Sequence, residues 1–396
     1  MPKKTVEEVE VKGKKVLLRV DFNVPLNINT GTISNDSRIR ASIPTIKYLF
    51  DHKAKIILCS HLGRPKGKVV ENLRMAPIAQ RLSQLMGLPV NMASDCIGQE
   101  VESKVGTLKE GDILVLENLR FHPEEEADDP DFARRLAGLA DIYVNDAFGS
   151  AHRVHASTVG VAKYLPAVAG FLMKKELEVM GKLLHNPERP LACLIGGAKV
   201  GDKIELLQNM LRRVDMLLVG GGMAATFLKT QGYEVGHSLT EDDKLGLANK
   251  LLQEAEEWRV PFLLPIDAVV AEEIKDGAPT RVVPTTNIPS GSHIVDIGPQ
   301  SIELFYSELR KCRTITWNGP MGIYEIPQFA QGTRSIASFL STLNATTIIG
   351  GGSSAEIVQE MGLSDKMTHV STGGGASLSF LEGVTLPGVK VLLDKK

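Results

Sequence analysis

Seven residues in the first half of the chain have side chains suited to holding a small anion, and they lie at or near the ends of short apolar runs. These residues are Asp21, Asn23, Arg38, His61, Arg64, Arg120 and Arg153. The planar fork of arginine matches carboxylate and phosphate oxygens in pairs, and each charge-assisted bond contributes on the order of 1.5–3 kcal/mol. One arginine alone is more often a surface or salt-bridge residue. Four at one sheet edge would form a cationic pocket for a phosphorylated acid.

Glycine is used differently in the second half of the chain. Every glycine pair or triplet lies beyond residue 190, at residues 196–197, 220–222, 350–352 and 373–375, and each follows a short apolar run. Glycine lets the backbone approach an anion closely, and the amides of a following helix attract it. Such turns also occur simply where a chain reverses, but four in one half favour phosphate binding by the backbone.

Two lysines accompany the first glycine pair. Lys199 and Lys203 are four residues apart, so a helix beginning near Val200 would direct both ammonium groups to one side. A solvated lysine pair is the alternative. Because phosphoryl transfer needs chiefly positioning and positive charge around the transferred oxygens, the pair is suited to that reaction.

A nicotinamide-dependent dehydrogenase is a second interpretation of the glycines. Residues 220–225 and 350–355 satisfy the loose Gly-x-Gly-x-x-Ala pattern. The pattern requires an acid about 20 residues on that ends the second strand. Glu241 and Asp242 have the distance, but they follow Thr240 at an apparent helix start, where acids are common anyway. No Gly-Lys is followed by Ser or Thr, so the chain has no Walker A loop.

Short apolar runs alternate with longer segments of helical spacing. Because continuous Val, Ile and Leu runs indicate burial on both faces, they predict parallel sheets covered by helices, and the fold class is α/β with two doubly wound lobes. A helix between Gly170 and Asn186 carries an apolar stripe and is a candidate connector. The expected strands are residues 16–20, 56–59, 113–116, 142–144, 191–195, 216–219, 262–264, 313–317, 346–349 and 369–371.

Composition limits the possible partners. The chain has 396 residues, which suggests two or three domains, and a formal net charge of -2, which offers no overall attraction for nucleic acid or an anionic membrane. No run of 18 apolar residues is present, and the N-terminus does not resemble a signal peptide. The four cysteines are too widely spaced for a Cys-x-x-Cys motif. We expect a cytoplasmic enzyme, with the acidic run at residues 124–130 forming a solvated loop.

Six ordered segments make the chain resemble phosphoglycerate kinases over essentially its whole length. They are residues 19–25, 60–65, 145–149, 196–200, 317–322 and 371–375. The resemblance implies a phosphoglycerate-binding lobe (1–170), a hinge helix (171–187), a nucleotide-binding lobe (188–380) and a C-terminal tail returning to the first lobe (381–396). It also implies reversible phosphoryl transfer between 1,3-bisphosphoglycerate and Mg-ADP to give 3-phosphoglycerate and Mg-ATP, with hinge closure, in a monomer.

The resemblance assigns the seven residues of the first half to phosphoglycerate binding, with Arg38 touching the transferring group. It assigns Lys199 and Lys203, helped by the amides of residues 373–375, to the phosphates and to catalysis. Glu325 matches the ribose-binding acid. The positions implied for catalysis in the second half and for nucleotide binding are Gly197, Ala198, Lys199, Lys203, Gly221, Asn318, Pro320, Glu325, Gly351, Gly352, Ser353, Ser354, Gly373 and Gly374.

Four positions depart from the family pattern. Ser353 stands where the family has an aspartate that ligates the nucleotide-bound magnesium, and a hydroxyl is a poor substitute for a carboxylate. Ala225, Ile294 and Ser379 replace the usual asparagine, glycine and glutamate. We therefore expect Mg²⁺ to be held by nucleotide phosphates and water, with Asp202 or Glu356 as possible helpers. A catalytically weak homologue that binds phosphoglycerate or a protein partner is the alternative.

Overall fold

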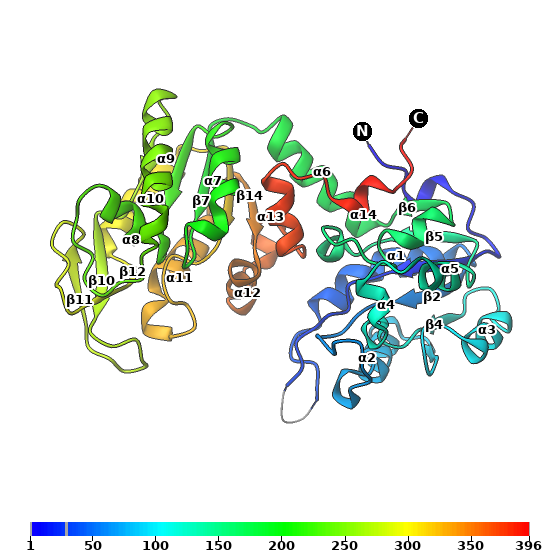
Figure 1. The fold of residues 1–396 in the computed structure, drawn as a ribbon. Coiled ribbons are helices and arrows are strands. Elements are labelled where there is room, and N and C mark those ends of the chain that lie inside the picture. The colour runs from blue at the N-terminus through cyan, green and yellow to red at the C-terminus, as the bar shows by residue number, and fades with distance from the viewer. Residues whose placement is uncertain (1, 28–30, 396) are drawn as a thin grey trace. The chain divides into compact units, whose positions relative to one another are not determined.

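The computed structural model describes residues 2–27 and 31–395, which form two compact units (Figure 1). Unit 1 comprises the chain up to Glu178 together with the residues from Thr385 onward, and unit 2 comprises Val179–Val384. The chain passes from one unit to the other within α6 (Phe171–His185). Among the described residues, no helix has the length and hydropathy needed to cross a membrane.

Unit 1 is built on a parallel sheet of six strands in the order β3-β4-β2-β1-β5-β6. Alternate residues of β1 point to opposite faces, and Val16, Leu17 and Leu18 are all fully buried. Helices α1 and α2 supply the core on one of these faces. The strands are β1 (Lys15–Arg19), β2 (Lys55–Cys59), β3 (Asn91–Met92), β4 (Ile113–Val115), β5 (Ile142–Asn145) and β6 (Ala167–Ala169); the helices are α1 (Ser37–Asp51), α2 (Ala76–Met86), α3 (Gln99–Gly106), α4 (Pro123–Glu126), α5 (Pro130–Ala137) and α14 (Pro387–Lys390).

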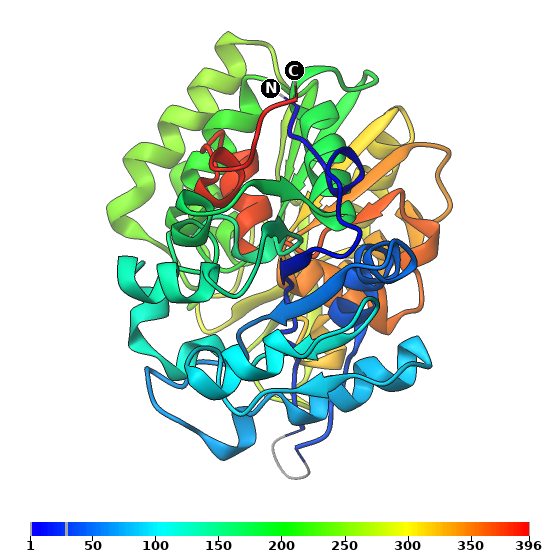
Figure 2. The same cartoon turned by 90° about the vertical axis from the view of Figure 1, so that its right-hand side faces the viewer.

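The two ends of the chain lie side by side on unit 1, as Figures 1 and 2 show. Lys3 forms an antiparallel bridge with Asp394, and their side chains form an ion pair of 2.8 Å. Gly388 N donates to Ala151 O at 2.8 Å. The segment after unit 2 therefore completes the surface of unit 1.

Unit 2 has a second parallel sheet, in the order β15-β14-β13-β7-β8-β9, and a three-stranded antiparallel sheet, β11-β10-β12. The parallel strands are β7 (Leu191–Ile195), β8 (Met216–Val219), β9 (Phe262–Leu263), β13 (Thr314–Asn318), β14 (Thr346–Gly350) and β15 (His369–Val370). The antiparallel strands are β10 (Asp267–Ala271), β11 (Thr280–Pro284) and β12 (His293–Ile297).

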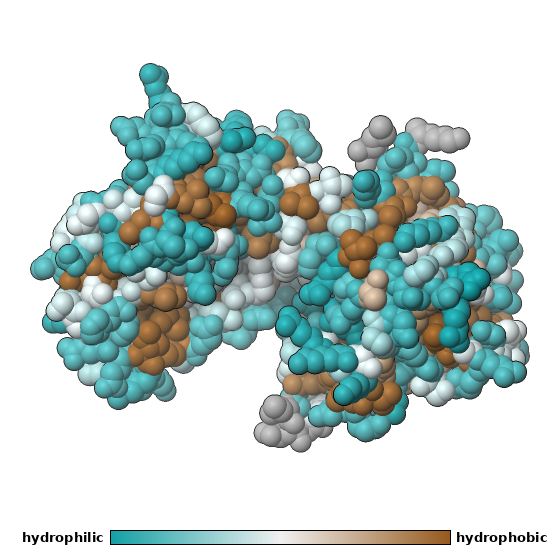
Figure 3. Space-filling model, viewed as in Figure 1, coloured by the Kyte–Doolittle hydropathy of each residue, from teal (hydrophilic) through white to brown (hydrophobic). Residues whose placement is uncertain are grey.

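Two separate cores cover the faces of the second parallel sheet. Cys193 and Ile195 of β7 join the core formed with α7 (Ile204–Leu211), α8 (Met223–Thr230), α9 (Leu245–Glu257) and α13 (Gly375–Leu381). Ala192 and Leu194 join the core formed with α10 (Pro299–Leu309), α11 (Gln331–Leu340) and α12 (Gly352–Glu360). This two-sided burial confirms the predicted α/β class with two doubly wound lobes. The visible face of each unit is mostly hydrophilic, with separate apolar patches (Figure 3).

All ten expected strands are present; residues 191–195 and 216–219 match without a shift, and no end of the other strands is shifted by more than one residue. The strands that the sequence did not predict are β3, β6 and the antiparallel sheet. β3 and β6 are too short to give a periodic signal, and β11 is mostly exposed, so it lacks the apolar run of a buried strand. The expected division at residues 170, 187 and 380 remains a prediction, since the two contact units meet within α6 and between Val384 and Thr385.

Asp146 holds the first turn of α6. Its Oδ1 accepts hydrogen bonds from Leu172 N (2.9 Å) and Met173 N (3.2 Å), which satisfies backbone amides that have no partner within the helix. A Cβ atom at Gly170 would lie 2.2 Å from the same oxygen, so glycine is required for this close approach. Burial raises the pKa of Asp146 to about 6.

We expect Asp146→Asn to change how stability depends on pH. Because the folded-state pKa is raised, the stabilisation from protonated Asp146 is fully present below its unfolded value near 4 and is lost as pH rises through about 6. The asparagine side chain keeps an oxygen that can accept these hydrogen bonds, but it does not titrate. The variant should therefore gain free energy of unfolding relative to the parent chain between roughly pH 5 and pH 7.5, measured by urea denaturation.

Asp146→Ala is the matched control. At both ends of this pH range its free energy of unfolding should be about 1–2 kcal/mol lower than that of Asp146→Asn, the usual cost of losing a helix cap. Parallel pH profiles for the parent chain and Asp146→Asn would show that Asp146 does not titrate in this range.

Candidate functional site

The polar segments of unit 1 follow the carboxyl ends of adjacent parallel strands. β1 pairs with β2 on one side and with β5 on the other, so the strand order reverses at β1. In open α/β sheets, ligands bind outside the carboxyl ends of the strands at such a switch point. Asp21 and Asn23 follow β1, and His61 follows β2.

Hydrogen bonds and an ion pair connect several of the expected residues. Arg38 Nη1 lies 3.0 Å from Asp21 Oδ2. Gly63 N donates to Asn23 Oδ1 at 2.8 Å, and Arg120 Nη1 donates to Gly63 O at 2.9 Å. The structure therefore brings the segments after β1, β2 and β4 together.

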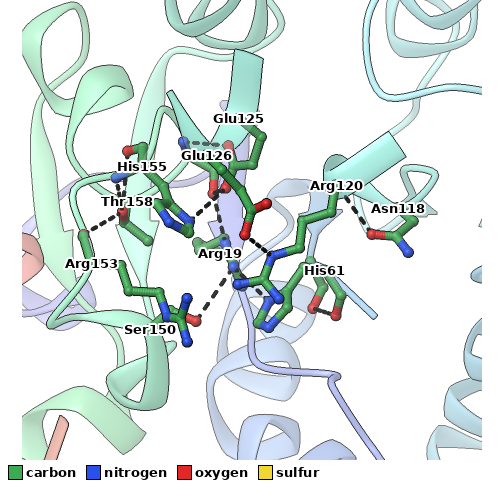
Figure 4. A network of polar contacts seen from close by, with 12 residues as sticks. Arg19, His61, Asn118, Arg120, Glu125, Glu126, Ser150, Arg153, His155 and Thr158 are labelled. Carbon is green, nitrogen blue, oxygen red and sulfur yellow. Dashed lines mark hydrogen bonds and ion pairs between the residues drawn. The ribbon is translucent and has the colours of Figure 1, made fainter. Parts of the chain in front are cut away.

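His61 is buried, at 5% exposed, and lies within the field of several arginines. Burial is the main cause of a pKa well below the ordinary value for His61, and the charges of Arg19, Arg120, Arg153 and Arg38 lower it further. His61 is therefore neutral near pH 7. Figure 4 shows His61, Arg120 and Arg153 grouped around Arg19.

Two of the predicted arginines have no hydrogen-bond or ion-pair partner for the guanidinium group within residues 2–27 and 31–395. Arg64 is exposed, and Arg153 is half-buried. Unpaired cations beside buried cations repel one another, so an anion bound among them would lower the electrostatic energy. The cluster is suited to a ligand with several negative charges.

A buried network beneath this cluster was missed by the sequence analysis. Arg19 is 1% exposed, and its Nε donates to Ser157 Oγ at 2.9 Å. Ser157 in turn donates through Oγ to Glu125 Oε1 (2.6 Å) and through its backbone N to Oε2 (2.9 Å). Burial raises the pKa of Glu125, although the charge of Arg19 opposes this. A charged residue inside the apolar run 16–20 was the available signal.

The expectation of a solvated acidic loop at residues 124–130 was wrong for Glu125, which is 0% exposed. The helix α4 begins at Pro123 and turns Glu125 into the interior, towards Ser157. Glu126 lies 3.2 Å from Arg120 Nε, at an angle that does not form a hydrogen bond. The negative charges of Glu125 and Glu126 therefore compensate the positive charges of the buried Arg19 and Arg120.

The switch point of unit 2 lies between β7 and β13. Gly196 N donates to Asn318 O, and Gly197 N donates to Pro320 O, both at 3.0 Å. A Cβ atom at Gly196 would lie 2.0 Å from Pro320 O, so only glycine allows this approach. The turns after the two strands pack against each other through their backbones.

A cavity of about 420 Å³ opens beside these turns. Its apolar wall includes Ala225, Leu228, Ile294 and Ile297. A volume of this size and an apolar lining with a few polar groups are typical of small-molecule sites. The predicted nucleotide-binding residues that line the cavity are Gly197, Ala198, Gly221, Pro320, Glu325 and Ser353.

Lys203 and Asn318 form the polar end of this region. Lys203 Nζ donates to the backbone oxygen of Asn318 at 3.3 Å and also contacts its side-chain oxygen. The Asn318 Nδ2 group is buried and has no hydrogen-bond partner within the described parts of the chain. Burial lowers the pKa of Lys203 to about 8. An unpaired donor and an ammonium group thus lie together at the strand ends.

The expectation of an α-helix beginning near Val200 was wrong, whereas the binding of one ligand by both Lys199 and Lys203 stays a prediction. Gly201–Lys203 form a 3-10 turn, and α7 begins only at Ile204. Gly201 N donates to Glu241 Oε2 at 2.8 Å, which holds the turn outside the helix. Lys199 is exposed, and its ammonium group has no partner within residues 2–27 and 31–395, whereas Lys203 is partly buried.

The later glycines precede helices at the same sheet edge. Gly351 (φ +82°) precedes α12, and Gly374 (φ +49°) precedes α13 after the turn at Gly373. Both conformations favour glycine. Ser354, two residues after Gly352, is fully buried and accepts a hydrogen bond from Gly319 N at 2.7 Å, so it joins α12 to the segment after β13.

Carboxylates are sparse around this cavity. Asp296 and Glu325 are the acids that line it. Asp296 accepts hydrogen bonds from Ile297 N (2.9 Å) and Gly332 N (2.6 Å), and burial raises its pKa to about 7. Ser353 is neutral and interacts with the Tyr324 hydroxyl. The cavity therefore does not offer the oxygen-rich cage that Mg²⁺ or Ca²⁺ would need.

Each unit has a parallel sheet with polar or glycine-rich segments at its switch point, an arrangement typical of α/β enzymes that bind ligands at the strand ends. Residues 6–384 match the family described as phosphoglycerate kinase. The chain is 58% identical over 399 residues to the phosphoglycerate kinase of Dictyoglomus turgidum and 56% identical over 395 residues to that of Pelotomaculum thermopropionicum, with 100% of each chain covered. The chain belongs to the phosphoglycerate kinase family.

Solved structures support the same assignment. The phosphoglycerate kinase from Coxiella burnetii has a TM-score of 0.88 and 39% identity, covering 98% of each chain. The enzyme from Pyrococcus horikoshii OT3 has a TM-score of 0.85 and 33% identity, covering 99% of this chain and 98% of its own. The resemblance inferred from six short segments is therefore confirmed.

We expect the affinity for ADP, measured without metal by calorimetry, to fall as Lys203 loses its proton. If the phosphates bind only the ammonium form, the Kd should rise roughly tenfold per pH unit once the pH exceeds the Lys203 pKa of about 8. Lys203→Arg keeps its charge and should give a flat profile. Equal profiles for the two proteins would contradict phosphate binding by Lys203.

Proposed function

We propose that the chain reversibly transfers a phosphoryl group from 1,3-bisphosphoglycerate to Mg-ADP, giving 3-phosphoglycerate and Mg-ATP. The observation that carries this proposal is the family match over residues 6–384, together with relatives of 54–58% identity that are named phosphoglycerate kinase. The cationic cluster of unit 1 and the cavity of unit 2 offer one site for each substrate. No feature favours a non-catalytic homologue or a dehydrogenase.

Unit 1 binds the phosphoglycerate in this proposal. Arg64 and Arg153, whose guanidinium groups have no partner among the described residues, take the non-transferring phosphate and the carboxyl group, with Arg120 beside them. Neutral His61 offers a hydrogen bond without adding charge. Asp21 pairs with Arg38 and fixes the direction of its guanidinium group, while Asn23 holds the backbone at Gly63.

Unit 2 binds the nucleotide. The base lies against the apolar wall of the cavity, with Glu325 available for the ribose hydroxyls. The backbone at Gly197, Gly221, Gly351 and Gly352 approaches the nucleotide closely, and Ala198 and Pro320 complete the lining. Asn318 Nδ2 supplies a donor that is otherwise unpaired.

Catalysis consists of positioning and charge stabilisation. Arg38, Lys199 and Lys203, with the amides at Gly373 and Gly374, surround the transferring phosphoryl group as its charge spreads over three oxygens. Direct in-line transfer needs no covalent intermediate on the protein. The substrates bind to different units, so closure about residues 171–187 brings them together and excludes water.

Magnesium enters as part of the nucleotide substrate. The phosphates and water supply most of its oxygen ligands, because Ser353 cannot provide a carboxylate. Asp202 and Glu356 are the nearest alternatives in sequence to the two phosphate-binding turns. We also propose that the enzyme acts as a cytoplasmic monomer, as the resemblance implies.

Arg38→Ala should lower kcat about 10²–10³-fold in a coupled assay with Mg-ATP and 3-phosphoglycerate, since it removes one group that stabilises the transition state. Arg40→Ala is the matched control: Arg40 lies on the same helix but pairs with Asp36 at 2.8 Å on the exposed surface. Its kcat should stay close to that of the parent chain. Turnover at background in the parent chain would refute the proposed activity, and equal kcat for both variants would refute the role of Arg38.

Ser353→Asp should lower the Mg²⁺ concentration that gives half-maximal rate at fixed ATP, because a carboxylate adds a hard oxygen ligand. Ser353→Ala removes the hydroxyl without adding charge and should leave the Mg²⁺ requirement unchanged. Identical magnesium curves for the aspartate and alanine variants would exclude a metal role at this position.

A further inference from the structure

Unit 1 contains a group of three metal-ligating side chains that is separate from both substrate sites. Asp95 and Cys96 follow β3, and His122 follows the 3-10 turn Leu119–Phe121 after β4. One ligand atom from each residue lies within 4.8 Å of the other two. None of the three belongs to the segments that resemble the kinase motifs. We propose that Asp95, Cys96 and His122 bind one divalent transition-metal cation of the Zn²⁺ type.

The chemistry of the donors selects the class of metal. A thiolate, an imidazole and a carboxylate together suit borderline-soft cations such as Zn²⁺ and Co²⁺, whereas Mg²⁺ and Ca²⁺ prefer oxygen ligands alone. Three protein ligands leave the fourth tetrahedral position for water or a small ligand. The side chains of His122 and Asp95 are 26% and 47% exposed, so a cation can reach them from solvent. Cys96 is fully buried behind them.

The present spacing requires only small movements. Metal–ligand bonds of about 2.0–2.3 Å at tetrahedral angles place donor atoms roughly 3.4–3.6 Å apart. His122 Nε2 and Asp95 Oδ1 now lie 2.7 Å apart, as a hydrogen-bonded pair. A cation between them would increase the distance between the two atoms by less than about 1 Å. It would replace that hydrogen bond with two metal–ligand bonds.

The surrounding backbone holds the ligands in place. Cys96 N donates to Asp95 Oδ1 at 2.7 Å, and Glu117 N donates to Asp95 O at 3.3 Å. The His122 ring packs against Phe132 at a centroid distance of 5.4 Å. Two segments, joined by a hydrogen bond between residues 27 positions apart along the chain, are therefore fixed beside each other before any cation binds.

Binding would cross-link two parts of unit 1. As the metal–sulfur bond forms, the Cys96 thiol releases its proton to solvent. The cation then joins the segment after β3 to the segment after β4, which also carries Arg120, two residues before His122. A cation that binds only the folded state stabilises it. Zn²⁺ should therefore raise the Tm of the intact chain.

Co²⁺ tests the proposal, because a thiolate bound to Co²⁺ gives a charge-transfer absorption in the near ultraviolet. The full chain, reduced and freed of metal by dialysis against a chelator, should develop this band in proportion to Co²⁺ up to one equivalent. Added Zn²⁺ should abolish it. Cys96→Ser should lose the band, whereas Cys312→Ser, which changes another buried cysteine in unit 2, should retain it.

A second variant keeps the test decisive if Cys96→Ser folds poorly. His122→Gln changes a partly exposed side chain and should weaken Co²⁺ binding at least about tenfold, since even the loss of an outer-shell partner has that effect. It should also lose the rise in Tm with Zn²⁺. The proposal fails if the parent chain shows no thiolate band at equimolar Co²⁺, if Cys96→Ser shows the same band, or if His122→Gln binds as tightly as the parent chain.

Discussion

Because helices cover both faces of the parallel sheets, polar side chains that bind ligands can lie only at the ends of the strands. Alternate residues of β7 belong to different cores, so neither face of that sheet is open to a ligand. The strand ends remain, and the carboxyl ends of all strands in a parallel sheet meet at one edge. Both candidate substrate sites follow from this constraint. Asp21 and His61 gather at the edge of one sheet, and Gly197 and Asn318 gather at the edge of the other.

The cationic site of unit 1 depends on charges beneath it. Arg19 is fully buried, and a buried charge is costly unless it is paired and hydrogen-bonded. Ser157 and Glu125 supply that compensation. The supported Arg19 in turn bonds His61 through Nη2, at 3.0 Å from Nδ1. The buried residues Arg19, Ser157 and Glu125 thus hold His61 in place beneath the cationic cluster.

The two units are proposed to bind anions by different means. In the proposed function, unit 1 uses guanidinium groups, two of which have no partner among the described residues, whereas unit 2 uses backbone turns in which a Cβ atom would collide, as at Gly196. The side-chain site concentrates charge, and the backbone site leaves room for a large ligand. The difference suits a small, highly charged acid on one side and a nucleotide with an apolar base on the other.

The sequence by itself determined the α/β class, ten strands and the family, because apolar runs and glycine motifs are local signals. It also placed Asp21, His61 and Arg120 at strand ends. Only the tertiary structure decided that Glu125 is buried, that Lys203 rather than Lys199 is enclosed, and that Asp95, Cys96 and His122 meet. Burial and contacts between segments far apart in sequence arise when separate elements pack, so no local pattern encodes them. Short or exposed strands such as β3 and β11 depend on that packing too.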